Sequence, residues 1–144
     1  MKLLCRVTAL LMFSVVMFAQ SDMHKSPSPP PSEAQKSFTT IKSLAGEWEG
    51  PVTVAEMPQM SNGKPLRVTM RVTSRGNALV HEFQEAGTPL DPAKYDHPVS
   101  MFYVDGQEVM LVHYCDAGNR PRMTGKMSPD GKVVDFEFKD ISGS

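Results

Sequence analysis

The sequence predicts an all-β domain in which antiparallel strands follow one another as an up-and-down meander and close into a barrel. Two observations carry this prediction. Apolar and polar residues alternate along 66–73 and again along 134–139, which is the period of a strand with one buried face. Turn signals such as Asp105-Gly106 and Asp130-Gly131 separate the apolar segments, with no long helical pattern between them. A meander of this kind removes its free edges by closing into a barrel.

The N-terminal segment 1–21 has the three parts of a secretory signal peptide. Lys2 and Arg6 supply the positive charges, 9–19 is an apolar run, and Ala19 and Ser21 supply the small residues of a cleavage site. The apolar run is shorter than the ~20 residues that a membrane span needs, so cleavage is favoured over an uncleaved anchor. We therefore expect export to the periplasm or the extracellular space, with no stable membrane span after cleavage.

The next segment, 22–36, is rich in Pro and Ser and has no apolar period, which is typical of a disordered tether. The folded domain is expected at 37–144. Cys115 is the only cysteine left once the signal peptide is removed, so the mature chain has no partner for an internal disulfide. The domain must then be stabilised by a hydrophobic core.

Within the domain, Phe38, Ile41 and Leu44 have helical spacing, so a short helix is expected before Gly46. About seven strands follow, and tight turns join most of them. Gly76-Asn77 and the segment 116–119 supply two of these turns. The expected strands are 46–56, 66–75, 78–86, 99–104, 107–115, 121–128 and 132–140.

Four segments carry a resemblance to a known family: 44–50 (LAGEWEG), 102–106 (FYVDG), 111–115 (LVHYC) and 118–123 (GNRPRM). Together they resemble uncharacterised secreted bacterial proteins of the lipocalin-like (calycin) group. The resemblance implies a barrel with Gly46 and Trp48 as structural residues at its closed end, and hence a buried Trp48 indole. Barrels of this group have eight or ten strands, so seven strands indicate a truncated or open barrel, with truncation favoured.

The formal net charge of -1 argues against a nucleic-acid partner, which would need a basic surface to replace phosphate counterions. The leading hypothesis is an exported module that binds a small apolar or anionic amphiphilic molecule in the barrel. Arg120 and Arg122 share a strand face and could bind the anionic head group, with Tyr114 and His113 nearby. A solvated strand face is the alternative interpretation of the two arginines, and it holds if Met123 points inward instead.

Two other classes of function stay open. One is a structural or protein-interaction β domain that binds no ligand. The other is a haem, metal or thiol-dependent protein that uses His81, His113 and Cys115, of which the last two share a strand face. The sequence shows no nucleophile elbow, phosphate loop or paired-carboxylate motif, so we expect no catalytic residues, no metal site and no cofactor. An enzyme is accordingly the less favoured class.

Overall fold

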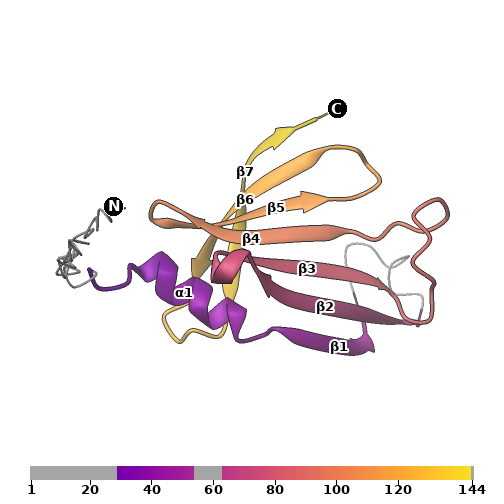
Figure 1. Ribbon diagram of the computed structural model, residues 1–144, viewed down its shortest axis with the longest axis horizontal. Coiled ribbons are helices and arrows are strands. Elements are labelled where there is room, and N and C mark those ends of the chain that lie inside the picture. Colours follow the sequence, from indigo (N-terminus) through magenta and orange to yellow (C-terminus); the bar gives the residue numbers. More distant parts are fainter. Residues whose placement is uncertain (1–28, 54–62, 144) are drawn as a thin grey trace, which may run out of the picture.

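The structure is a computed structural model that describes residues 29–53 and 63–143. It confirms the antiparallel up-and-down meander: seven strands form one sheet in chain order, preceded by one short helix (Figure 1). The sheet is open, because its order runs from β1 to β7 and those two strands are its edges. The elements are α1 (Glu33–Lys42), β1 (Gly46–Pro51), β2 (Pro65–Thr73), the 3-10 turn η2 (Ser74–Gly76), β3 (Ala78–Glu85), β4 (Val99–Asp105), β5 (Glu108–Tyr114), β6 (Arg120–Met127) and β7 (Val134–Ser142).

Helix α1 begins earlier than predicted, so the tether boundary at residue 36 is wrong. Ser32 and Gln35 form a capping box: the Gln35 backbone N–H donates to Ser32 Oγ at 3.2 Å, and the Ser32 backbone N–H donates to Gln35 Oε1 at 2.8 Å. This pair satisfies two backbone donors at the helix start, so 33–36 belong to the helix. The predicted signal peptide and the first part of the tether, 22–28, lie outside the described residues.

One face of the sheet packs against α1, and we call it the inner face. Leu79, Phe102 and Leu111 are opposite one another on β3, β4 and β5 and lie on this face. Helical spacing at 34, 38 and 41 puts three apolar side chains of α1 onto them. The resulting buried core consists of Ala34, Phe38, Ile41, Leu79, Phe102, Val109 and Leu111.

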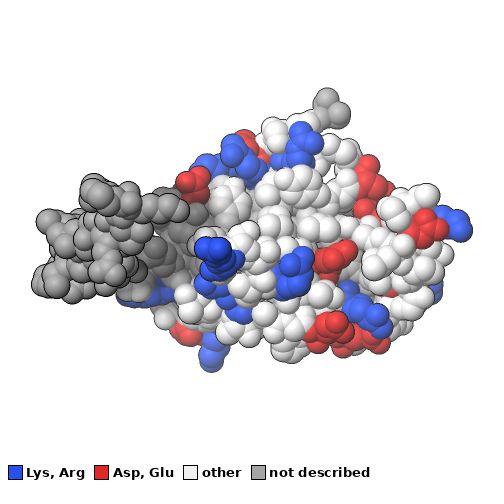
Figure 2. Space-filling view, viewed as in Figure 1, with Lys and Arg blue, Asp and Glu red and all other residues white. Residues whose placement is uncertain are grey.

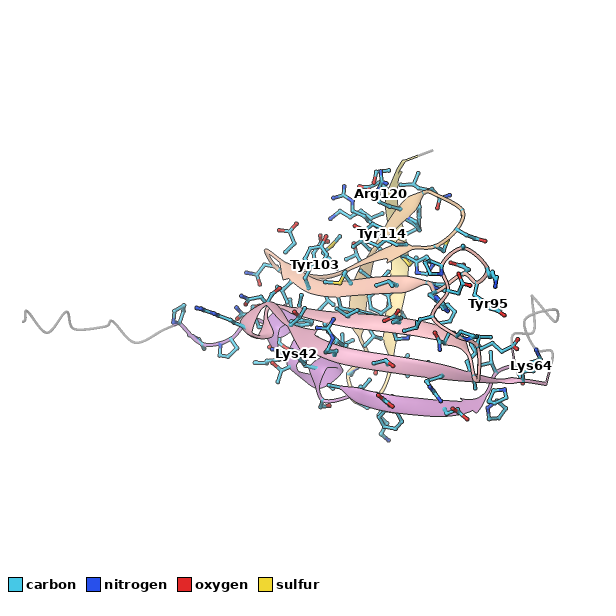
Figure 3. All side chains as sticks on the ribbon, turned by 45° about the vertical axis from the view of Figure 1, so that its right-hand side comes forward. Lys42, Lys64, Tyr95, Tyr103, Tyr114 and Arg120 are labelled. Carbon is cyan, nitrogen blue, oxygen red and sulfur yellow. The ribbon has the colours of Figure 1, made fainter. Side chains whose placement is uncertain are left out.

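The helix covers only one end of the inner face, and we call this the covered end. Lys42, at the C-terminus of α1, donates from Nζ to the Gly76 carbonyl at 3.1 Å and so ties the helix to the turn between β2 and β3. Lys64, before β2, lies at the opposite end of the sheet, which we call the open end (Figure 3). The two ends of the same strands therefore have different surroundings.

Two predicted hairpins differ in detail from the structure. Asp105 pairs with Glu108, so the two turn residues are 106 and 107, one position later than predicted. The loop between β6 and β7 spans 128–133 rather than two residues. There the Asp130 carboxylate accepts from Ser128 Oγ at 2.6 Å and from the Lys132 N–H at 3.2 Å, and these bonds stabilise the longer loop.

The first strand also differs: β1 ends at Pro51, short of the predicted end at 56, and 54–56 lie outside the described residues.

On the exposed surface, Lys and Arg are interspersed with Asp and Glu, without a large patch of one sign in this view (Figure 2). Within the described part of the chain, no helix is long and apolar enough to cross a membrane.

Candidate functional site

Three polar side chains lie side by side on the inner face, next to the buried core. His81 is opposite Ser100 in the β3–β4 register, and Ser100 is opposite His113 in the β4–β5 register. Because side chains alternate along a strand, these residues share the face of Leu79 and Phe102, two positions further toward the open end. We call His81, Ser100 and His113 the histidine row.

The contacts within the row leave one imidazole nitrogen, Nδ1 of His81, without a polar partner. Ser100 is 5% exposed, and its Oγ is 2.9 Å from His113 Nδ1, so these two side chains form a hydrogen bond. Nδ1 of His81 is buried and has no hydrogen-bond partner among the described residues. The His81 ring instead packs against two aromatic rings, with centroids 5.7 Å from Phe83 and 6.1 Å from Phe102. A buried ring nitrogen without a partner costs free energy that a bound polar group would recover.

The surroundings of His81 also keep its ring uncharged at neutral pH. Burial in the apolar face lowers the pKa of His81 below its ordinary value of 6.5, and the positive charge that nearby His113 can carry lowers it further. His81 therefore offers a neutral imidazole and Ser100 a hydroxyl, and each of these groups can both donate and accept hydrogen bonds.

An open pocket adjoins the row at the open end of the sheet. Its volume is about 330 Å³, and His113 lies in its wall. Such a volume lies in the range of small-ligand pockets. Its lining is mixed: Leu66, Phe83, Pro98 and Cys115 are apolar or weakly polar, while Gln84, Glu85 and Asp96 are polar.

The inner face carries very little formal charge. By the strand register, none of the described Lys and Arg residues of β1–β7 lies on this face. Glu85 is its single acidic strand residue, at the open end, where it forms an ion pair with Lys64. A ligand seated on the histidine row would meet mainly apolar and neutral polar groups.

The predicted arginine anchor is wrong in its orientation. Met123 packs against the inner core, so its neighbour Arg122 points to the outer face. There Arg122 Nε and Nη2 donate to the two Asp140 carboxylate oxygens, each at 2.6 Å. The hydrogen bonds from Arg122 lower the pKa of Asp140. A guanidinium already paired in this way is not available to an interior ligand.

Arg120 and Tyr114 also lie on the outer face. Arg120 has the same strand parity as Arg122, and Tyr114 is opposite Val99, one position from the inward-facing His113. Both side chains are exposed (Figure 3). Of the four residues predicted to contact ligand, the structure therefore places only His113 on the inner face.

Trp48 is exposed, so the expected burial of its indole is wrong. Its exposed fraction is 55%, and its Nε1 donates to the Leu44 carbonyl at 3.0 Å. The physical reason is the open sheet: β1 is an edge strand, and no described strand closes over it. Gly46 begins β1 with a φ of 153°, which a residue with a side chain rarely adopts.

The predicted metal or thiol alternative requires His81, His113 and Cys115 to lie close together. The structure brings His81 and His113 onto one row, and half-buried Cys115 lies in the wall of the same pocket as His113. Among the described residues, however, no group of three or more His, Cys, Asp or Glu side chains could hold a metal ion. His81 and His113 belong to the histidine row, and Cys115 lies in the wall of the adjoining pocket.

Sequence reasoning missed Ser100 as a site residue. The signal was present, because the hairpin between β4 and β5 places residue 100 opposite His113 once the turn is centred on 106 and 107. A turn centred one residue earlier, as predicted, shifts the strand register, so that residue 100 is no longer opposite His113.

Comparison of this chain with protein-family models, curated protein sequences and solved structures gave no match. The functional interpretation therefore depends on the geometry of the chain itself.

Proposed function

We propose that this protein is an exported module that binds a small apolar or amphiphilic molecule on the open end of its inner face. The observation that supports this most is the histidine row, a group of polar side chains within an otherwise apolar face, with His113 in the wall of the pocket. Binding sites for small molecules combine these two features, since apolar contact supplies affinity and a few polar groups orient the ligand. The polar head is assigned to His113, which lines the pocket and is hydrogen-bonded to the buried Ser100, and the apolar part to the neighbouring Phe83 and Leu66.

Burial of the apolar part supplies the affinity. Removing apolar area from water contributes about 25 cal/mol per Å², so a chain that covers ~200 Å² gains roughly 5 kcal/mol before the costs of association.

Trp48 provides a direct readout for binding. It is the only tryptophan of the chain and lies half-exposed on the inner face, opposite Val68, which is opposite Phe83. Titration of the full chain with decanol should shift the tryptophan emission to shorter wavelength in a saturable way at micromolar ligand. Folded protein that shows no saturable binding of decanol, decanoate or decylammonium would overturn the proposal.

A pair of variants separates binding from folding. Phe83→Ser removes apolar surface from the inner face, whereas Glu82→Ser changes the neighbouring residue on the outer face. We expect Phe83→Ser to weaken binding at least about tenfold and Glu82→Ser to leave it unchanged. Circular dichroism of both variants shows whether the sheet is retained.

A protein-interaction domain is the second candidate, and the exposed edge strand β7 favours it. Phe138 is 66% exposed and Ile141 is 52% exposed on that strand. Apolar side chains on a free edge are a typical site for pairing with another chain. Retained folding without ligand binding, together with a native mass above that of the monomer, would favour this second function.

A further inference from the structure

A second pocket lies on the outer face of the sheet, where the loop between β3 and β4 meets the end of β5, and we call it the outer pocket. Its volume is about 480 Å³, and Val99 and Tyr114, which are opposite each other in the β4–β5 register, form part of its wall. We propose that the outer pocket binds a small organic cation such as a quaternary ammonium ion, held by two tyrosine rings and two carboxylates. The rings are those of Tyr95 and Tyr114 (Figure 3), and the carboxylates are those of Asp96 and Asp116.

Both tyrosines of the outer pocket are accessible to a ligand. Tyr95 is 39% exposed and Tyr114 is 44% exposed, although both line the pocket. The Tyr95 ring packs against His97, a further lining residue, with ring centroids 6.5 Å apart. The face of an aromatic ring is electron-rich and attracts a cation placed over it, and quaternary ammonium ions are typical ligands of such rings. The two tyrosines therefore supply apolar contact and cation attraction together.

The charges around the outer pocket favour a cation over an anion. Asp96 and Asp116 are exposed, and neither forms an ion pair with a described residue. Asp96 Oδ1 accepts the Asp116 backbone N–H at 3.2 Å, which ties the loop to the end of β5 and leaves both negative charges in place. Lys94 also lines the pocket, but its Nζ is 3.4 Å from Asp91 Oδ2 in an ion pair. With His97 counted as neutral at pH 7, the described lining is net negative.

The same lining suits an organic cation better than a metal ion. A divalent metal ion needs several oxygen, nitrogen or sulfur ligands that replace its hydration shell. In the part of the chain that the structure describes, no group of three or more His, Cys, Asp or Glu side chains could hold such an ion. An alkylated ammonium ion has an apolar surface, so it needs aromatic contact and nearby negative charge rather than a full set of ligands. The outer pocket supplies both, in a volume typical of small-molecule sites.

Choline and its uncharged isostere dimethylbutanol test this inference, because carbon replaces nitrogen in the isostere and the two molecules differ mainly in charge. We expect the full chain to bind choline at least about tenfold more tightly than dimethylbutanol, as measured by calorimetry in low-salt buffer. Equal affinities would show that apolar contact alone is recognised and would overturn the inference. Folded protein that shows no saturable binding of choline up to about 10 mM would overturn it as well.

Two variants separate the aromatic contribution from the electrostatic one. Tyr114→Leu keeps an apolar side chain and removes the ring, and Asp116→Asn keeps the shape and removes the charge. We expect each to weaken choline binding at least about threefold, and Asp116→Asn to leave the affinity for dimethylbutanol unchanged. The matched controls Tyr103→Leu and Asp135→Asn lie on the outer face away from this pocket and should keep the affinity for choline. Wild-type affinity in folded Tyr114→Leu and Asp116→Asn would contradict the inference.

This inference goes beyond the proposed function, because the outer pocket and the inner-face pocket are different sites. They adjoin each other, with Asp96 and Cys115 in the wall of both, but Phe83 lines only the inner one. Phe83→Ser, which should weaken decanol binding, should therefore leave choline binding unchanged. Loss of choline binding in folded Phe83→Ser would place the cation on the inner face and overturn the assignment to the outer pocket. Choline binding without decanol binding would overturn the proposed function and leave this inference standing.

Discussion

The covered and open ends of the inner face are built from the same strands and differ in what lies over them. At the covered end, Leu79 and Phe102 are buried beneath Phe38 of α1. Two positions along the same strands, His81 and Ser100 lie beyond the core cluster that the helix completes. The β3–β4 register is continuous through all four of these residues, so the pairing of these two strands does not account for the difference.

Helix α1 therefore divides the inner face of the sheet into a buried core and a candidate binding site. Apolar side chains under α1 lose contact with water and stabilise the fold. Beyond the helix, His113 lines a pocket at the open end and can contact a ligand. A change at the covered end should therefore mainly affect stability, and a change at the open end should mainly affect binding.

The largest expected effect comes from removing an aromatic ring at the covered end. Phe38 is 4% exposed, so Phe38→Ala should cost about 3–5 kcal/mol of unfolding free energy, measured by urea denaturation. Trp48→Ala, at an edge strand with the indole 55% exposed, should cost roughly 1 kcal/mol or less. Equal losses for the two variants would contradict the contrast between the two ends.

A smaller effect is expected from adding a methyl group at each end. A Cβ at Gly125 would lie 2.6 Å from Cε1 of Phe136, whose ring packs against Phe102 with centroids 5.6 Å apart. Gly125→Ala should therefore destabilise the protein by about 1–3 kcal/mol through overpacking. Gly50→Ala is the control, since a Cβ there meets nothing within 4 Å, and its melting temperature should hardly change.

The pH dependence of stability should report His81 at the open end. Its pKa in the folded protein is lowered below 6.5 by burial first and by His113 second, so the unfolded chain binds this proton more readily. His81 therefore has no effect on the free energy of unfolding well above pH 6.5, where it is neutral in both states. As the pH drops below 6.5, the unfolded chain takes up the proton first and the folded protein becomes less stable. Urea midpoints at about pH 7.5 and about pH 5.5 measure the loss, and His81→Gln should reduce it. An identical loss in wild type and variant would rule out this assignment.

The smallest effect is expected on the outer face. Arg122→Ala removes an ion pair whose two side chains are both exposed, so it should lower the melting temperature slightly at low salt and less at high salt. Binding of decanol should be unchanged. Weaker binding in this variant would instead favour the arginine anchor that the sequence suggested.

Much of the fold could be predicted from the sequence because strand signals are local. Alternation along 66–73 and 134–139 depends only on neighbouring residues, and both segments are strands in the structure. The start of α1 was missed because the Pro and Ser content before it hid the capping pair Ser32 and Gln35. Of the candidate site, His113 was found, His81 was named only as a metal or thiol residue, and Ser100 was not found.

The sequence by itself determined which residues share a strand face, because side chains alternate with a period of two whatever surrounds the strand. It determined, for example, that Met123 and Arg122 point in opposite directions. Only the tertiary structure decided that Met123 faces the core, that Trp48 lies on an open edge and that Ser100 lies between two histidines. These outcomes depend on strand register and on where α1 packs, and both are set by contacts between residues far apart in the chain.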